Sequence, residues 1–130
     1  MIVGVGTDIT AVSRFERIIE KNARFAAKIL TPSELSVYND KKGMNQLQYL
    51  AGRFAVKEAV AKAFGTGIGE LNFQHIECLN NELGAPIVNV INDRIDSRYH
   101  SLMIHVSISH NEDQVVAFVV IEEECVGLSL

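Results

Sequence analysis

The chain has 130 residues, of which 48% are hydrophobic and 22% are charged, a composition typical of a globular protein rather than a disordered chain. Its net charge of −4 disfavours a general nucleic-acid-binding role, which usually depends on a basic surface. No apolar run approaches the roughly 18 residues that span a bilayer, and the start MIVGVGTDI has the pattern of a strand rather than of a signal peptide. We therefore expect one cytoplasmic domain over residues 1–130, with Cys78 and Cys125 as free thiols and no membrane or nucleic-acid partner.

The first half of the chain has a mainly helical pattern. We predict, in chain order, a strand over residues 2–8, helices up to residue 20 and over 22–30, a short helix from residue 32, a loop over 41–45 and a helix over 46–64. Either Asp8 or Thr10 can cap the first helix. The segment from Thr31 to Glu34 fits a capping box, and Gly65 is a natural end for the last helix.

The second half changes to the period of strands. We predict a strand over residues 71–78, turn residues over 80–86, a strand over 87–91, an irregular or helical segment over 92–101, and strands over 104–109 and 115–121 around a turn at 111–113. The predicted fold class is therefore α+β, with N-terminal helices packed on antiparallel strands of the C-terminal half.

Glu58 and Lys62, in the motif RFAVKEAVAKAFGTGIG, are four residues apart and therefore lie on one face of the predicted helix. Such a pair can be a surface ion pair that stabilises the helix by about 0.2–0.5 kcal/mol. It can also hold a metal ion and a phosphate, because the surrounding alanines allow a ligand to approach closely. Arg53 and Lys57 add cations on a neighbouring row of the helix.

Asp8, at the end of the first predicted strand, also has two possible roles. It can cap the following helix, or it can supply a second oxygen ligand if it lies near Glu58 in space. Mg²⁺ often takes only one or two carboxylates from a protein, with water and substrate phosphates completing an octahedron. Magnesium is therefore the cofactor that such a pair would hold.

The segments GVGTD and GTGIG and the residue His110 are weaker signals. Neither segment has the complete dinucleotide-binding fingerprint or the phosphate-loop motif, so we expect turns that need the backbone freedom of glycine. His110 follows the predicted strand HVSIS at a turn, where it can be a surface residue, a phosphate contact or a proton shuttle.

Basic side chains recur every three or four residues along the first helical region, and we call them the basic stripe. Its members are Arg14, Arg17, Lys21, Arg24 and Lys28. They can form an ordinary solvated face. Because the whole chain is acidic, this local concentration of positive charge can instead attract an acidic macromolecular partner.

Three motifs taken together, GVGTDI, RFAVKEAVAKAFGTGIG and VSISH, resemble the bacterial holo-acyl-carrier-protein synthases, the small members of the 4′-phosphopantetheinyl transferases. The resemblance covers nearly the whole chain, and its central motif is the most specific. It implies the α+β fold of that family and a homotrimer with active sites at subunit interfaces. It also implies Mg²⁺-dependent transfer of 4′-phosphopantetheine from coenzyme A to a serine of apo acyl carrier protein in fatty acid biosynthesis, with release of adenosine 3′,5′-bisphosphate.

The resemblance further implies roles for single residues. Asp8 and Glu58 would be the metal ligands, Glu58 and Lys62 would be catalytic, and either Glu58 or a metal-bound water would take the serine proton. Coenzyme A would contact Arg53, Lys62, Gly65 and His110, and the carrier protein would contact Arg14, Lys21, Arg24 and Phe25. The chain departs from the family pattern at Gly84-Ala85-Pro86, where members often have Gly-Lys-Pro or Gly-Arg-Pro, so one cation is missing there.

Two other functions fit part of the pattern. A non-catalytic sensor could bind coenzyme A or a carrier protein, although it would not need Asp8, Glu58 and Lys62 together. An unrelated Mg²⁺-dependent nucleotide hydrolase could use the same three residues, but it would not need the basic stripe.

Overall fold

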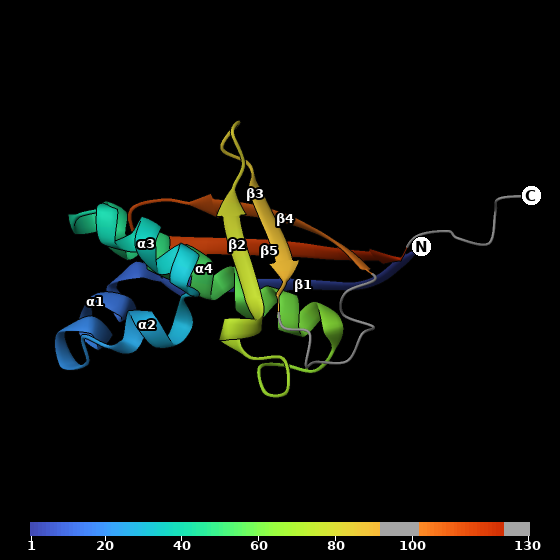
Figure 1. Ribbon diagram of the computed structural model, residues 1–130, viewed down its shortest axis with the longest axis horizontal. Coiled ribbons are helices and arrows are strands. Elements are labelled where there is room, and N and C mark those ends of the chain that lie inside the picture. The colour runs from blue at the N-terminus through green and yellow to red at the C-terminus, as the bar shows by residue number, and fades with distance from the viewer. Residues whose placement is uncertain (92–101, 124–130) are drawn as a thin grey trace, which may run out of the picture.

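The computed structural model describes residues 1–91 and 102–123 (Figure 1). Its elements are β1 (Ile2–Ala11), α1 (Val12–Lys21), α2 (Phe25–Ile29), α3 (Pro32–Asp40), α4 (Gly43–Phe64), the 3₁₀ helix η1 (Phe73–His75), β2 (Ile76–Asn80), β3 (Pro86–Val90), β4 (Leu102–His110) and β5 (Gln114–Glu123). The predicted irregular segment over residues 92–101 and Cys125 lie outside the described residues. None of the helices in the described ranges is long and apolar enough to cross a membrane.

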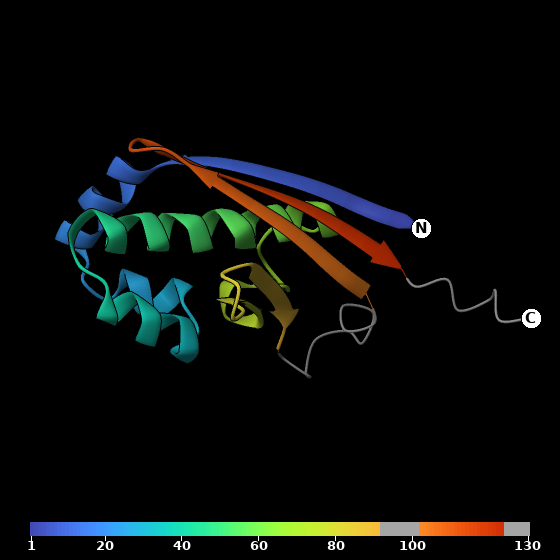
Figure 2. The same cartoon turned by 90° about the horizontal axis from the view of Figure 1, so that it is seen from above.

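The long helix α4 lies between two layers. On one side is an antiparallel sheet in the order β1-β5-β4, and on the other are α3 and the β2–β3 hairpin (Figure 2). Most side chains from Tyr49 to Ala63 are consequently buried, because a helix covered on both sides must be apolar around most of its circumference. The predicted α+β fold, with helices against antiparallel strands, is confirmed.

Two glycines of β1 allow α4 to approach the sheet closely. A side chain on Gly4 or Gly6 would overlap the backbone carbonyl oxygens of Ala63 and Ala59, respectively. Neither glycine has a positive φ, so the expectation that GVGTD forms a turn is wrong. The contact sets the distance between β1 and the face of α4 that carries Glu58 and Lys62.

Several helix boundaries follow the predicted capping signals. Thr31 and Glu34 form the complete capping box at the start of α3. Gly65 ends α4 in the left-handed conformation at φ 78°, and Gly67 continues the turn at φ 66°, which confirms the predicted turn at GTGIG. Helix α4 already begins at Gly43, so the predicted loop over residues 41–45 is shorter than expected.

Two predicted boundaries are wrong. Strand β1 continues through Asp8 and Thr10 to Ala11, and no side chain caps α1 because both candidate residues are held in the ladder with β5. The strand predicted over residues 71–78 begins only at Ile76. Asn72 accepts a hydrogen bond from the backbone N–H of Gln74 at 2.9 Å and so initiates η1 instead.

Candidate active site

Asp8, Glu58 and Lys62 come together where β1 passes α4. The Lys62 ammonium donates to the Asp8 carboxylate at 3.2 Å and to the Thr7 carbonyl oxygen at 2.9 Å. The Lys62 side chain is 53% exposed and that of Asp8 is 16% exposed, so the ion pair faces solvent. Lys62 thus pairs across to the strand, which the i,i+4 spacing with Glu58 did not predict.

Glu58 is half-buried beside this ion pair. Burial raises the pKa of Glu58, and the negative charge of Asp8 raises it further, while Lys62 and Arg14 oppose the rise. Two carboxylates therefore lie close enough to repel each other, and the positive charges of Lys62 and Arg14 act against that repulsion. A cation bound between the two carboxylates would relieve this repulsion.

The donor set has the chemistry of a magnesium site rather than of a zinc site. Among residues 1–91 and 102–123, no group of three or more His, Cys, Asp or Glu side chains could hold a metal ion. A closed site for zinc is therefore absent from the described part of the chain. Two carboxylate residues open to solvent fit Mg²⁺, which keeps several waters and takes its other ligands from phosphates.

Lys57, next to Glu58 in sequence, lies on a different side of α4 in an apolar interior. Its fully buried ammonium donates to Glu34 at 2.6 Å, to the Ile29 carbonyl at 2.7 Å and to the Phe73 carbonyl at 2.9 Å. Glu34 in turn accepts hydrogen bonds from the backbone N–H groups of Thr31 and Cys78. Lys57 does lie on a neighbouring row of α4, as expected, but α3 and β2 cover that row and the cation is buried.

Arg53 and His110 line one cavity of about 240 Å³, together with Lys41, Gln48 and Tyr49. Arg53 is 6% exposed, and its guanidinium donates at 3.0 Å to both the Cys78 carbonyl and the Asn80 side chain. Its guanidinium carbon also lies 4.4 Å from the centre of the Tyr49 ring. His110 is the last residue of β4 rather than part of the following turn.

This cavity lies apart from the cluster around Glu58 in the same chain. Asp8, Glu58 and Lys62 do not line it. At 3.6 residues per turn, the Arg53 side chain leaves α4 about 140° away from that of Glu58 and about 180° away from that of Lys62. The structure thus groups the predicted residues into two sets on opposing sides of α4, and Gly65 follows Lys62 at the exposed end of the helix.

The basic stripe spans two helices. Arg14, Arg17 and Lys21 are exposed on α1, Arg24 precedes α2, and Lys28 is exposed near the end of α2. The Arg14 guanidinium carbon lies 5.1 Å from the centre of the Phe54 ring, on α4 one turn before Glu58. Phe25 is half-buried, with its ring centre 6.3 Å from that of Phe15. The stripe therefore begins next to Glu58 and extends away from it.

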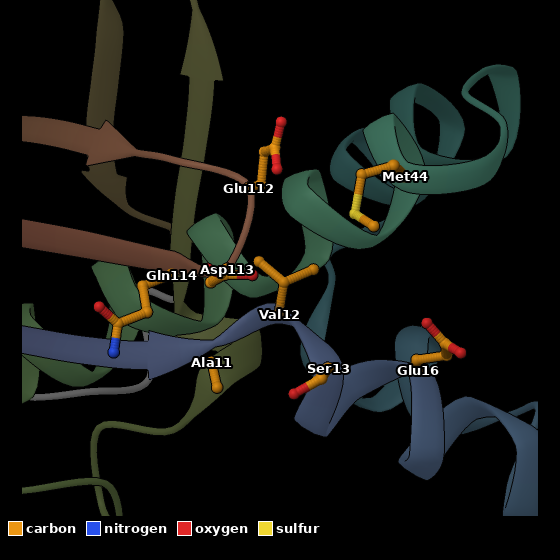
Figure 3. A pocket seen from close by; sticks show the side chains of 8 residues that line it. All are labelled: Ala11, Val12, Ser13, Glu16, Met44, Glu112, Asp113 and Gln114. Atoms are coloured by element: carbon orange, nitrogen blue, oxygen red, sulfur yellow. The ribbon is translucent and has the colours of Figure 1, made fainter.

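A larger cavity, of about 570 Å³, lies where β1 meets α1 (Figure 3). It is lined by acidic side chains, among them Glu16 and Glu112, beside Met44. None of the residues predicted to bind a metal, coenzyme A or a carrier protein lines it. Cavity size alone therefore does not identify the site that the sequence motifs indicate.

Known proteins provide an independent comparison. Residues 4–119 match the sequence profile of the 4′-phosphopantetheinyl transferase superfamily. Holo-[acyl-carrier-protein] synthases of Latilactobacillus sakei and Oceanobacillus iheyensis are 45% and 46% identical to the chain over 122 residues, which are 94% of this chain and 98% of each relative. The crystal structure of a Bacillus anthracis holo-(acyl-carrier-protein) synthase in complex with CoA (3′,5′-ADP) matches with a TM-score of 0.84 at 41% identity, over 95% of this chain and 99% of that one. The chain therefore belongs to the 4′-phosphopantetheinyl transferase superfamily, within its holo-[acyl-carrier-protein] synthase family of enzymes.

Proposed function

We propose that residues 1–130 form one domain that transfers 4′-phosphopantetheine from coenzyme A to a serine of apo acyl carrier protein, as in fatty acid biosynthesis. The serine oxygen forms a bond to the phosphorus that carries pantetheine. The bond from that phosphorus to the oxygen bridging the diphosphate breaks, and adenosine 3′,5′-bisphosphate leaves. A cytoplasmic location agrees with the free thiol of Cys78.

The cluster of Asp8, Glu58 and Lys62 carries this proposal. Its two carboxylates would hold Mg²⁺, which when bound neutralises diphosphate charge. Lys62 is half exposed at the edge of the cluster, so its ammonium can move from Asp8 to a diphosphate oxygen and stabilise charge as the leaving group departs. Either Glu58 or a metal-bound water would accept the serine proton.

The basic stripe supports a macromolecular substrate rather than a free nucleotide. Arg14 lies beside Phe54, and its positive charge lowers the pKa of Glu58. A partner bound along the stripe would therefore reach the cluster of Asp8, Glu58 and Lys62. Arg14, Lys21, Arg24 and Phe25 would contact the acidic carrier protein. A nucleotide hydrolase would have no use for the basic stripe.

The two sets of residues on opposing sides of α4 support an assembly in which coenzyme A binds between copies, and the resemblance implies that this assembly is a homotrimer. In one chain, α4 separates Arg53 and His110 from Glu58, so one ligand reaches both sets more readily if they come from neighbouring subunits. The face of the sheet turned away from α4 also carries exposed apolar side chains, namely Val3, Val5, Ile9, Val116 and Phe118. Contact between such faces would bury this area in an assembly.

The decisive test of the activity is the intact mass of a fatty-acid-type apo acyl carrier protein after incubation with the enzyme, Mg²⁺ and coenzyme A. We expect the carrier to gain one phosphopantetheine, and no gain with EDTA present. Binding of coenzyme A and carrier without this mass gain would support a non-catalytic sensor instead. Release of phosphate from nucleotides without a carrier, unaffected by Arg14→Glu, would support a hydrolase.

A further inference from the structure

Helix α2 is too short to be stable by itself. It has five residues, whereas isolated helices below about 12–15 residues are marginal in water. The last carbonyl groups of any helix also lack partners within the helix. Arg24, Phe25 and Lys28 lie on or next to α2, so the geometry of this part of the basic stripe depends on what holds the helix in place.

Two side chains from elsewhere in the chain bind the C-terminal carbonyls of α2. The Gln74 amide nitrogen donates to the carbonyl oxygens of Ala27, Lys28 and Leu30 at 3.0, 3.1 and 2.8 Å, and the Lys57 ammonium donates to that of Ile29 at 2.7 Å. The Gln74 amide nitrogen has only two hydrogens, so its three carbonyl acceptors share them, and together with Lys57 it contacts the carbonyls of four successive residues.

The two donors connect α2 to the catalytic helix. Lys57 precedes Glu58 on α4, and Gln74 belongs to η1, whose Phe73 carbonyl accepts a hydrogen bond from the same Lys57 ammonium at 2.9 Å. Gln74 is itself fixed, because its backbone N–H donates to the Asn72 side chain at 2.9 Å. Hydrogen bonds from α4 and η1 thus fix the position of α2, because the short helix has few hydrogen bonds of its own.

We propose that Gln74 is a positioning residue for carrier-protein recognition, which holds α2 so that Arg24 and Phe25 face the carrier at a fixed distance from Glu58. This inference rests on the proposed docking of an acyl carrier protein along the basic stripe. Gln74 has no contact with Asp8, Glu58 or Lys62 among its hydrogen bonds in the described residues, so it acts through α2 alone.

Gln46 provides a matched control. Its side-chain amide donates to the Tyr38 carbonyl at 3.0 Å near the C-terminus of α3, a helix without stripe residues. Gln46→Ala therefore removes the same kind of helix-end hydrogen bond at a different place. Gln74→Glu keeps the size of Gln74 but replaces the donor with an oxygen that repels the carbonyls of α2.

The test measures KM for a fatty-acid-type apo acyl carrier protein, KM for coenzyme A, kcat, and the affinity for the carrier by fluorescence anisotropy. Gln74→Ala should raise the carrier KM and dissociation constant about three- to tenfold, with kcat and the coenzyme A KM within about twofold of wild type. Gln74→Glu should raise the carrier KM at least as much, and Gln46→Ala should leave it unchanged. Hydrogen exchange at the α2 amides should accelerate in Gln74→Ala but not in Gln46→Ala.

A carrier KM in Gln74→Ala equal to that of Gln46→Ala would overturn the inference, as would an equal rise in the KM of both substrates. Arg24→Glu distinguishes the positioning role of Gln74 from the proposed docking of the carrier. If Arg24→Glu weakens carrier binding and Gln74→Ala does not, only the positioning role is wrong. If wild type binds no carrier, or Arg24→Glu leaves its affinity unchanged, the proposed docking is wrong and the inference fails with it.

Discussion

Lys57 and Glu58 are adjacent on α4, yet their surroundings differ completely. Lys57 is fully buried, pairs with Glu34 and uses its ammonium in three short hydrogen bonds. Glu58 is half-buried beside the like charge of Asp8, with Lys62 bonded to Asp8. The Lys57–Glu34 pair has all its polar groups satisfied within the protein, whereas Glu58 lies beside a like charge and has no ion pair of its own among the described residues.

The difference separates the stability of the fold from its chemistry. A buried ion pair with satisfied partners joins α3, α4 and β2 and has no capacity left for a ligand. The solvent-facing ion pair of Lys62 and Asp8 stabilises the fold little, and its cluster is where we propose that a cation and a diphosphate bind. We therefore expect mutations around Lys57 to lower the free energy of unfolding, and mutations around Glu58 to lower turnover with little effect on stability.

The largest effect on stability should come from Lys57→Met. It leaves the buried Glu34 carboxylate without its counter-ion, so we expect the free energy of unfolding to fall by about 3–5 kcal/mol. Lys62→Met is the matched control, because its ion pair is exposed and should cost less than about 1 kcal/mol. Urea denaturation followed by circular dichroism compares them, and equal losses in the two variants would refute the contrast.

Glu58→Gln should lower turnover strongly without lowering stability. Loss of the proposed metal ligand and proton acceptor should lower the rate of carrier modification by about 100- to 1,000-fold. Removing one of two repelling carboxylates should leave the unfolding midpoint equal to or above that of wild type. Rates from intact-mass time courses check this, and turnover within about threefold of wild type would contradict the catalytic assignment.

Gly6→Ala tests whether the catalytic cluster depends on the close approach of β1 to α4. The added methyl group meets the Ala59 carbonyl and must push the helix away, so we expect a loss of about 1–3 kcal/mol together with lower turnover. Gly52→Ala serves as the stability control, because its methyl group would lie 3.8 Å from Val115, an ordinary contact. Wild-type stability in Gly6→Ala would show that α4 accommodates the methyl group, and would contradict the need for a close approach of β1 to α4.

The smallest effect is a pH dependence of stability from Glu58. Its pKa in the folded protein is raised, so protonation favours the folded state. In EDTA, the wild type should therefore lose stability relative to Glu58→Gln as pH rises from the ordinary glutamate range through the raised pKa. Parallel denaturation series over pH 4–7 measure this difference. A difference that stays constant, or that grows in favour of wild type, would contradict the raised pKa that burial and the nearby Asp8 charge give Glu58.

Local signals made the helical half of the fold and the residues of the cluster predictable. Thr31 to Glu34 and Gly65 encode helix ends through side-chain and backbone preferences that act within a few residues. The pairing of β1 with β5 joins segments more than 100 residues apart, and no local pattern specifies it. Asp8 could be recognised as a candidate ligand, but its role as a cap was ruled out only by that ladder.

The roles of Lys57 and Arg53 depended on tertiary context. Both were expected only as cations on a row next to Glu58, and the second layer of the fold buries them against Glu34 and Asn80. The near-continuous apolar character of α4 around them is the one signal that could have indicated burial on every side. The clamp of Gln74 on α2 has no sequence signature, because its acceptors are backbone carbonyls.

The most direct test of the central claim is a crystal of the protein grown with coenzyme A and soaked with Mn²⁺ in place of Mg²⁺. The account predicts an anomalous-scattering peak about 2.1 Å from carboxylate oxygens of both Asp8 and Glu58, in contact with the diphosphate. A diphosphate bound without a peak at these carboxylates, or a peak held by other side chains, would contradict it.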